Sequence, residues 1–381
     1  MAVMFKLQPL PPKKDIETKA VLRQAAVAHR KLAELKGISV NIPNQGILIN
    51  SLSLQEAKDS SAVENIITTH DELFKKATFP KYAGNAAAKE VQNYATALRT
   101  GYTLVAKDGI LSGRHIQDIQ EQLEANQAGY RRQAGTNLKN EATGEVVYTP
   151  PQSHKEILDL MDNLEKFINE DDLYDADLLV KMALVHYQFE SIHPFYNGNG
   201  RTGRIINVLY LVLKNLLDIP VLYLSRHIIE TKAEYYQRLQ DVRDHDAWEA
   251  WVLYMLAGVE KTSQHTIQLV QGIRDAMQFY KVEIRKGYKF YSQDLINNLF
   301  SHPYTKIGYV MRDLKVTRLT AAKYLDELAE AKFLSKQKIG RSNYYINNAL
   351  YGLLTEPPNL QGATESPPAA EPVTQEGRIE E

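Results

Sequence analysis

The sequence predicts a mainly helical protein with two small β elements. Apolar residues recur at helical spacing over long stretches, as Leu178, Met182 and Val185 do. Segments rich in β-branched and aromatic residues are short and lie beside proline or glycine, at residues 144–151 and 333–347. The chain of 381 residues exceeds one average domain, so it is long enough for several packed helices and a sizeable core.

The N-terminal region, residues 1–110, is predicted to consist of helices. Alanine, leucine and charged residues alternate at helical spacing over 16–36, 54–73 and 85–100. Gly37 is predicted to end the first of these helices, because glycine commonly follows a helix C-terminus.

Residues 111–277 are predicted to form the core of the protein. Helices are expected over 114–125 and 158–167, and a long apolar run from Arg201 onward predicts a buried helix. Residues 144–148 carry β-branched and aromatic side chains before a proline pair, which predicts a short hairpin strand.

The most informative stretch is residues 193–204, which reads His-Pro-Phe-Tyr-Asn-Gly-Asn-Gly-Arg-Thr-Gly-Arg. Gly198 and Gly200 lack Cβ atoms, so the backbone N–H groups there can approach an anion closely. The turn precedes a helix, whose N-terminus carries unsatisfied N–H groups and the positive end of the helix dipole. Arg201 and Arg204 lie three residues apart on one helical face, so both can grip one polyphosphate. The stretch therefore predicts a phosphate-binding site.

His193 is a candidate general base beside that turn. Pro194 disfavours helical dihedrals at His193, which is therefore expected in a loop between two helices. A neutral imidazole there can take a proton from a hydroxyl nucleophile. Phe195 is expected to point into the core, and Asn199 to add side-chain donors for phosphate. A packed loop without chemistry is the alternative for His-Pro-Phe alone, and the neighbouring glycines and arginines favour a functional site.

The stretch resembles the signature of Fic proteins, H-x-F-x-(D/E)-G-N-G-R-x-x-R. Most proteins with the full signature transfer AMP from ATP to a hydroxyl of a target protein. By this resemblance His193 would be the base. Asn199, Arg201 and the backbone of residues 198–200 would hold the α- and β-phosphates, and Arg204 would bind the γ-phosphate.

Asn197 stands where Fic proteins usually carry an acidic residue that helps to hold Mg²⁺. An amide oxygen also coordinates a hard cation but brings no charge, so Asn197 is the candidate ligand for Mg²⁺ or Mn²⁺. In Fic proteins, a lysine in place of the glycine that follows the signature asparagine is associated with a kinase-like orientation of the nucleotide. Gly200 occupies that position here, which favours AMP transfer over phosphate transfer.

Ser60 to Asn65, Ser-Ser-Ala-Val-Glu-Asn, resembles the inhibitory motif of Fic proteins, (S/T)-x-x-x-E-(G/N). By this resemblance Glu64 would pair with Arg204 and occupy the arginine that the γ-phosphate requires. The alternative is a solvated helix start with a capping interaction. In some family members the same glutamate positions a water for AMP removal.

Two further features follow from the resemblance. Fic proteins dock the target's backbone on a hairpin flap, which would correspond to residues 144–151; a plain surface hairpin is the alternative. Tyr235 is a candidate for an adenine pocket, with core packing as its alternative. Trp248, Trp251 and Tyr254 recur at helical spacing and are predicted to form a packed stripe.

Residues 285–350 resemble a winged helix-turn-helix. Helices are predicted over 291–300, 305–312 and 319–331, followed by strands over 333–338 and 343–347. If the module binds DNA, the contacts would come from Arg318, Lys323 and Tyr324 in the major groove and from Lys336, Lys338 and Arg341 on phosphates. Neighbouring acidic residues reduce the positive charge of this face, so docking of a protein partner is the alternative.

Composition adds limits on the environment. The chain has 45 Lys and Arg against 46 Asp and Glu, so its net charge gives no reason to expect binding to nucleic acid or to an acidic membrane. It has no cysteine, no long apolar N-terminal region and no apolar run of roughly 18 residues. We expect a cytoplasmic protein without membrane contact. Residues 355–381 are rich in proline and glutamate and are predicted to be disordered.

Two function classes follow. The first is an auto-inhibited transferase that moves AMP from ATP to a Ser, Thr or Tyr hydroxyl of a protein and releases pyrophosphate, with self-modification and homodimerisation as further expectations. The alternative is a nucleotide-sensing DNA-binding regulator with a weakly active or inactive core, or an enzyme that removes AMP.

Overall fold

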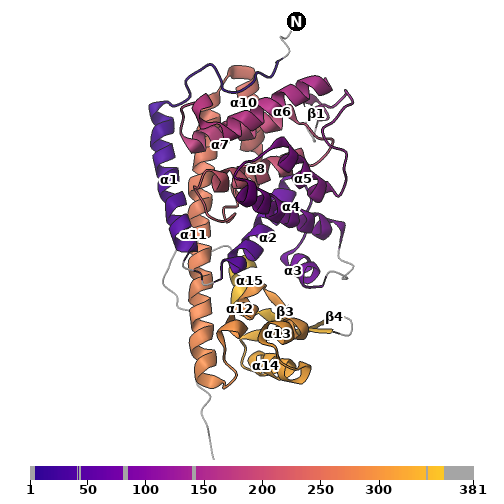
Figure 1. The fold of residues 1–381 in the computed structure, drawn as a ribbon, viewed down its shortest axis with the longest axis vertical. Coiled ribbons are helices and arrows are strands. Elements are labelled where there is room, and N and C mark those ends of the chain that lie inside the picture. Colours follow the sequence, from indigo (N-terminus) through magenta and orange to yellow (C-terminus); the bar gives the residue numbers. More distant parts are fainter. Residues whose placement is uncertain are drawn as a thin grey trace, which may run out of the picture.

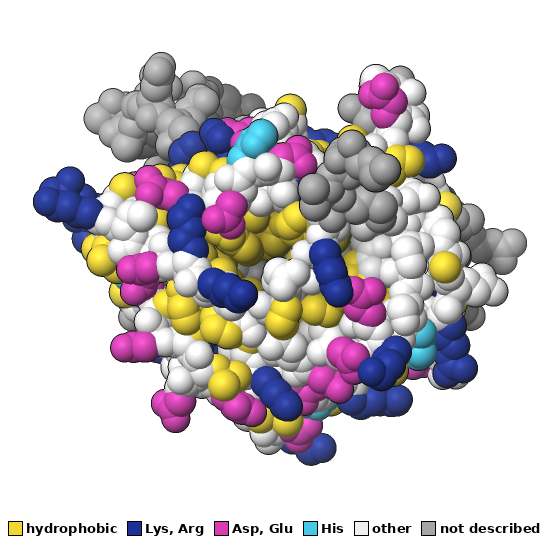
Figure 2. Space-filling model, turned by 90° about the horizontal axis from the view of Figure 1, so that it is seen from above, with side chains coloured by type: hydrophobic (Ala, Val, Ile, Leu, Met, Phe, Trp, Pro, Cys, Tyr) yellow, Lys and Arg dark blue, Asp and Glu magenta, His cyan; other side chains and the backbone are white. Residues whose placement is uncertain are grey.

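A computed structural model describes residues 5–40, 42, 44–79, 85–139, 143–339 and 342–355. It is mainly helical, with one two-stranded hairpin and one three-stranded sheet among those residues, so the predicted fold class is confirmed. None of the helices in these ranges combines the length and the apolar character that crossing a bilayer requires. Lys and Arg side chains intermix with Asp and Glu across the face seen in Figure 2, in line with the balanced composition.

The longest helix, α11 (Trp248–Gly287), runs for 40 residues along the long axis of the molecule. Most other helices surround its upper half in Figure 1, and a smaller group of helices and strands lies beside its lower half. The domain boundary proposed at residue 277 falls inside this continuous helix. Trp251 and Tyr254 are buried on α11, and the Trp251 indole N–H donates to the Ala183 carbonyl at 2.9 Å, so the packed stripe is confirmed.

Helix α1 (Lys19–Ser39) packs along α11 through a row of residues spaced three or four apart. The row comprises Val21, Ala25, Ala28, Leu32 and Leu35. The prediction that Gly37 ends this helix is wrong, because the helix continues to Ser39. Gly37 keeps a negative φ, and the buried hydroxyl of Ser39 donates back to the Leu35 carbonyl in the last turn.

Helices α2 (Gln45–Val63), α3 (His70–Thr78) and α4 (Ala86–Asp108) replace the predicted helices over 54–73 and 85–100. The first of those predictions is wrong at both ends. Asn44 caps α2 by accepting from the Gly46 N–H at 3.0 Å, and Asn65 adopts a left-handed φ of 61° just after the helix. The next helix, α3, follows Thr69, whose hydroxyl caps it by accepting from the Glu72 N–H.

The core is built on α7 (Leu178–Ile192) and α8 (Asn199–Leu213), which are buried along most of their length. Around them lie α5 (Gly113–Glu124), α6 (His154–Asn169), the short 3₁₀ helix η1 (Asp171–Leu173), α9 (Ser225–Glu230) and α10 (Lys232–His245). The predicted hairpin is present as β1 (Leu138–Lys139) paired antiparallel with β2 (Val146–Tyr148).

The C-terminal group contains α12 (Gln293–Ser301), β3 (Tyr304–Lys306), α13 (Ile307–Leu314), α14 (Arg318–Glu330), β4 (Leu334–Ile339), β5 (Ser342–Asn347) and α15 (Asn348–Thr355). The strands form an antiparallel sheet in the order β3-β5-β4. Thr305, predicted to begin a helix, pairs with Tyr345 in the sheet instead, and α15 was not predicted. Arg341 and the predicted disordered tail beyond Thr355 lie outside the described residues.

Candidate functional site

Residues 193–204 form the loop between α7 and α8 and the first turns of α8. His193 ends α7 with φ 48°, and Gly198 precedes α8 with φ 76°, so both adopt left-handed backbone. Phe195 is fully buried, as predicted. The Asn199 side chain accepts from the Phe195 N–H at 2.8 Å and donates to the Phe195 carbonyl at 2.9 Å. Asn199 therefore holds the loop's shape, in place of the free phosphate donor that the sequence predicts, and backbone N–H groups remain for an anion.

Arg131 fixes the position of His193. Its backbone N–H donates to the Pro194 carbonyl and its Nε donates to the His193 carbonyl, both at 2.8 Å. Nδ1 of His193 is buried and has no hydrogen-bond partner among the described residues. A left-handed φ in a non-glycine residue is a strained conformation of the kind found at functional sites.

Burial, followed by the charge of Arg131, lowers the pKa of His193 to about 4. The imidazole is therefore neutral near pH 7, with a lone pair ready to accept a proton. We expect its ring resonances in an NMR titration to stay constant from pH 8 down to pH 6 and to shift only on approaching pH 4. A midpoint near 6.5, the ordinary histidine value, would show a solvated ring instead.

Arg204 is held by the predicted inhibitory segment. Its Nε donates to the Ser60 hydroxyl at 2.7 Å, and its Nη2 donates to the Ser60 carbonyl and to Glu64 Oε1, each at 2.9 Å. Ser60 lies near the C-terminal end of α2, so the alternative of a helix start is wrong. Burial acts to raise the pKa of Glu64, but the charge and the hydrogen bond of Arg204, together with smaller contributions from Arg201 and His193, outweigh burial and lower that pKa, so Glu64 is ionised near pH 7.

Arg201 does not share a partner with Arg204. It pairs instead with Glu90 of α4 at 3.3 Å and Glu124 of α5 at 2.7 Å, and only 8% of its side chain is exposed. The sequence does not predict the roles of Glu90, Glu124 and Arg131. No local pattern marks them, because they lie 60 or more residues upstream of the loop.

Two of these carboxylates lie directly over the glycine turn. A Cβ atom added at Gly200 would clash with Glu64 Oε1, and one added at Gly198 would lie 2.6 Å from Glu124 Oε1. The N-terminus of α8 is thus covered by the carboxyl groups of Glu64 and Glu124, each also paired with an arginine. A side chain at Gly200 would shift the end of Glu64, and one at Gly198 would shift Glu124 and also meet the left-handed backbone there.

Tyr235 lies in the core. It is 1% exposed, and its hydroxyl hydrogen-bonds to Nε2 of His186 at 2.9 Å. Its ring packs against Trp251 and Tyr254. The alternative of core packing therefore describes Tyr235 better than an open adenine pocket.

Glu190 is a third acidic residue near the loop that no sequence pattern marks. It is buried on α7, and its Oε1 has no hydrogen-bond partner within the described part of the chain. Burial raises its pKa to about 7. A Cβ added at Gly203 would lie 2.7 Å from that oxygen, so Gly203 provides the room for Glu190 beneath α8.

The hairpin lies close to His193. The Tyr148 hydroxyl of β2 donates to the Ser191 carbonyl at 2.9 Å, two residues before His193. Val146 and Val147 are 52% and 45% exposed on the same strand. The hairpin thus offers an exposed apolar strand next to the candidate base.

Several basic residues of the C-terminal group already have acidic partners. Lys336 pairs with Asp326 at 2.7 Å, and Lys323 lies 3.8 Å from Glu327. The Tyr324 ring stacks on Phe290 with centroids 4.2 Å apart, so it packs within the group and does not project from it.

Comparison with protein families identifies three matching segments. Residues 22–103 match the N-terminal region of the Fic/DOC family, and residues 110–211 match the Fic/DOC family itself. Residues 277–350 match the C-terminal domain described for SoFic-like protein adenylyltransferases. Together these segments cover more than half of the chain.

Curated relatives match over shorter lengths. The chain is 30% identical over 89 residues to protein adenylyltransferase fic-1 of Caenorhabditis elegans, covering 23% of this chain and 16% of that protein. It is 29% identical over 178 residues to a probable protein adenylyltransferase of Aquifex aeolicus, covering 45% and 51%. The aligned segments thus span at most about half of these relatives.

Solved structures share the fold at low identity. A Fic family protein from Desulfovibrio desulfuricans G20 superposes with a TM-score of 0.56 at 20% identity, covering 89% of this chain and 98% of that chain. Fic-1 from Caenorhabditis elegans superposes with a TM-score of 0.52 at 19% identity, covering 67% and 74%.

Proposed function

Because this chain belongs to the Fic/DOC family, we propose that it is a protein AMP transferase whose active site is closed by its own glutamate. The observation that carries the proposal is the convergence at one loop: a neutral imidazole at His193, the N-terminus of α8, and Arg204 paired with Glu64 at 2.9 Å. The proposed reaction moves AMP from ATP to a Ser, Thr or Tyr hydroxyl of a protein and releases pyrophosphate.

The proposed mechanism needs no covalent enzyme intermediate. His193 takes the proton of the incoming hydroxyl, whose oxygen attacks the α-phosphorus while the bond to pyrophosphate breaks. Negative phosphate beside the imidazole raises its basicity, which offsets the low pKa that burial imposes. Backbone N–H groups of the first turn of α8, together with Arg201, neutralise the charge on the phosphates.

A divalent cation fits this site through oxygen ligands. Asn197 is exposed at the loop and offers a neutral amide oxygen, so a Mg²⁺ or Mn²⁺ ion would be held by Asn197 and by oxygens of the nucleotide. When bound, such an ion neutralises charge on the departing pyrophosphate.

Inhibition is proposed to act through competition for one guanidinium. Arg204 already donates to Ser60 and Glu64, so a γ-phosphate must displace Glu64 before the triphosphate lies along the loop. A buried guanidinium and a carboxylate form a strong charge-assisted contact, and breaking it without a replacement is costly. ATP would otherwise bind in an unproductive orientation, and basal transfer would be slow.

The hairpin of β1 and β2 is proposed as the docking edge for the target. Its strand is tied to the end of α7 through Tyr148 and exposes Val146 and Val147. An extended peptide can add to such an edge by main-chain hydrogen bonds, which brings a side-chain hydroxyl toward the base without demanding one sequence.

The C-terminal group is proposed as a winged helix module that docks a protein. The order of α13, α14, β4 and β5 corresponds to a helix-turn-helix followed by a wing. The acidic partners of Lys323 and Lys336 weaken its case as a DNA-binding surface.

The position of the label tests the reaction. We expect the Glu64→Gly protein, incubated with Mg²⁺ and ATP labelled on the α-phosphate, to gain acid-stable label on itself or on proteins of a lysate. ATP labelled on the γ-phosphate should leave protein unlabelled, because pyrophosphate departs. Label from the γ-phosphate would indicate a kinase. DNA binding that depends on ATP, with no label on protein, would favour the nucleotide-sensing regulator.

A further inference from the structure

Glu56 is a carboxyl group of α2 that is enclosed in the core. Only 2% of the residue is exposed, and it accepts hydrogen bonds from two other helices. The Tyr94 hydroxyl of α4 donates to Glu56 Oε1 at 2.8 Å, and the Ser225 hydroxyl donates to the same oxygen. The Ser225 N–H donates to Glu56 Oε2 at 3.2 Å. Because a buried carboxylate needs such donors, Glu56 joins α2 to α4 and to the start of α9.

A chain of hydrogen bonds connects Glu56 with Arg204. Arg204 Nε donates to the Ser60 hydroxyl at 2.7 Å, and the Ser60 side chain hydrogen-bonds to Tyr94. Since the Tyr94 proton is donated to Glu56, Ser60 supplies the proton of its bond to Tyr94. Ser60, Tyr94 and Glu56 thus form a hydroxyl relay, in which every donor points from the guanidinium toward the carboxylate. Hydrogen bonds arranged in this way polarise and strengthen one another in a medium of low dielectric constant.

The hydroxyl relay is closed to solvent. Ser60 and Tyr94 are fully buried, and Arg204 is 2% exposed. Burial raises the pKa of Glu56 to about 7, against the hydrogen bonds of Ser225 and Tyr94 and the charge of Arg204. At pH 8 the Glu56 carboxyl is therefore mainly ionised and only accepts hydrogen bonds. Loss of one link leaves a buried polar group without its partner, which costs more than loss of an exposed hydrogen bond.

The relay holds one edge of the Arg204 guanidinium. Ser60 accepts from Nε through its hydroxyl at 2.7 Å and from Nη2 through its carbonyl at 2.9 Å. The third nitrogen, Nη1, lies 3.1 Å from the position that a Cβ atom on Gly200 would occupy. The guanidinium therefore turns one edge toward α2 and a terminal nitrogen toward the glycine turn, where the phosphates are proposed to bind. Glu64 is not a link of the relay, so removal of Glu64 leaves both contacts from Ser60 in place.

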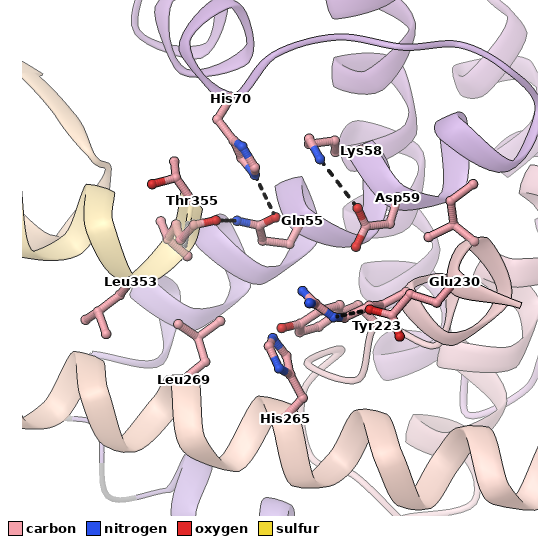
Figure 3. Close-up of a pocket in the computed structure, with 13 residues that line it drawn as sticks. Gln55, Lys58, Asp59, His70, Tyr223, Glu230, His265, Leu269, Leu353 and Thr355 are labelled. Carbon is pink, nitrogen blue, oxygen red and sulfur yellow. Dashed lines mark hydrogen bonds and ion pairs between the residues drawn. The ribbon is translucent and has the colours of Figure 1, made fainter. Parts of the chain in front are cut away.

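Gln55 holds a different side of α2. His70 Nε2 hydrogen-bonds to Gln55 Oε1 at 3.2 Å, and Gln55 Nε2 donates to the Leu354 carbonyl of α15. Figure 3 shows Gln55 between His70 and the end of α15. These contacts join α2 to α3 and α15 and include no link of the relay. A variant at Gln55 therefore loosens α2 without breaking the relay.

We propose that Tyr94 and Glu56 are positioning residues for Arg204, which they hold through Ser60 in the orientation that binds the γ-phosphate of ATP. This proposal rests on the proposed function and names the residues that give its site a preference for a nucleoside triphosphate over a diphosphate. The relay acts while α2 stays docked, with or without Glu64 on Arg204. A long side chain that is fixed in advance loses less entropy on binding, so a loosened Arg204 binds the terminal phosphate more weakly.

The preference for a triphosphate is tested by isothermal calorimetry on the full chain carrying Glu64→Gly, at pH 8 with Mg²⁺. The probes are the α,β-methylene analogues of ATP and ADP, which cannot lose pyrophosphate or phosphate at the α-phosphorus. We expect Tyr94→Phe and Glu56→Gln each to weaken binding of the ATP analogue by about threefold to tenfold, the usual effect of one hydrogen bond. Binding of the ADP analogue should change by less than about twofold, because a diphosphate has no γ-phosphate for Arg204.

Two control variants separate the relay from a general loss of packing. Tyr345→Phe removes another buried tyrosine hydroxyl that donates to a carboxylate, that of Asp326 at 2.7 Å in the C-terminal group. Gln55→Leu removes the other anchor of α2. Both should leave the ratio of the two dissociation constants unchanged. Equal weakening of both analogues in the relay variants, an ATP-specific loss in Gln55→Leu, or unchanged ATP affinity in both relay variants would overturn the proposal.

A double substitution tests whether the links act as one chain. In protein that already carries Ser60→Ala, Tyr94→Phe should change the ratio of the two dissociation constants by less than about 1.5-fold, because the connection to Arg204 is already broken. Losses that add in full would show that Tyr94 acts on the site independently of Ser60, which would contradict the relay.

A measurement without nucleotide separates failure of the relay from failure of the proposed reaction. In the Glu64→Gly protein, exchange of the Arg204 Nε–H with water, followed by NMR, should become about threefold or more faster on Tyr94→Phe. Faster exchange with an ATP-specific loss of affinity, but no AMP transfer by any variant, would count against the proposed reaction and leave the relay standing. Unchanged exchange with unchanged ATP affinity would overturn the relay even if Glu64→Gly transfers AMP.

Discussion

We expect His193→Ala to reduce AMP transfer by about 10²-fold to 10⁴-fold, the usual contribution of a general base. The comparison is made in the Glu64→Gly background, where transfer is measurable, by counting α-phosphate label on protein. The physical reason is that the neutral imidazole is the proton acceptor at the loop, and no other described side chain at residues 193–204 combines that basicity with burial beside α8.

Two controls separate chemistry from folding. His245→Ala removes an exposed imidazole at the end of α10 and should leave transfer unchanged. ATP affinity of the His193→Ala protein should also stay within about twofold, because the phosphates contact the α8 backbone and the arginines. Retention of most of the transfer rate in His193→Ala would remove this residue from the mechanism.

The second large effect is expected from Glu64→Gly. Freeing Arg204 should raise the rate of AMP transfer by about 10-fold to 100-fold, because Glu64 no longer competes with the γ-phosphate. This corresponds to a decrease of about 1.4 to 2.8 kcal/mol in the activation free energy. Ser60 keeps its contacts to Arg204 in this variant, so the guanidinium stays near its present position. The rate is measured as initial label incorporation from ATP labelled on the α-phosphate.

Glu170→Gly is the matched control, because Glu170 is an exposed glutamate that likewise follows the end of a helix. It should leave the rate unchanged. Glu124→Gln in the Glu64→Gly background then tests the second carboxylate. If Glu124 competes with phosphate for Arg201, the ATP dissociation constant should fall; if it only orients Arg201, the constant should rise. No increase in transfer on removal of Glu64 would contradict the inhibitory assignment.

The parts of the site that the sequence predicts are those carried by contiguous residues. The loop at His193, the buried Phe195 and the arginines of α8 follow from local spacing and from proline and glycine preferences. Glu64 was paired with Arg204 through a family resemblance, and the ion pair is present at 2.9 Å. Local rules thus identify a site when one short segment carries most of its chemistry.

Contacts between distant segments escape such rules. Arg131, Glu90 and Glu124 reach the loop only because α4, α5 and the segment after α5 pack around α8, and nothing in their own neighbourhoods signals this. Tyr235 shows that one residue type can fit two roles. A tyrosine can line a purine pocket or pack in the core, and the side chain of Tyr235 is buried in the core. The start of α2 was missed because tertiary packing around nearly the whole helix hides any amphipathic period.

The most direct test of the account is a crystal structure of the Glu64→Gly protein with a non-hydrolysable ATP analogue and Mg²⁺. The account predicts a triphosphate against the N-terminus of α8, with its γ-phosphate on Arg204 and its α-phosphorus facing the His193 imidazole. A triphosphate bound elsewhere, with His193 and Arg204 still enclosed as they are now, would contradict it.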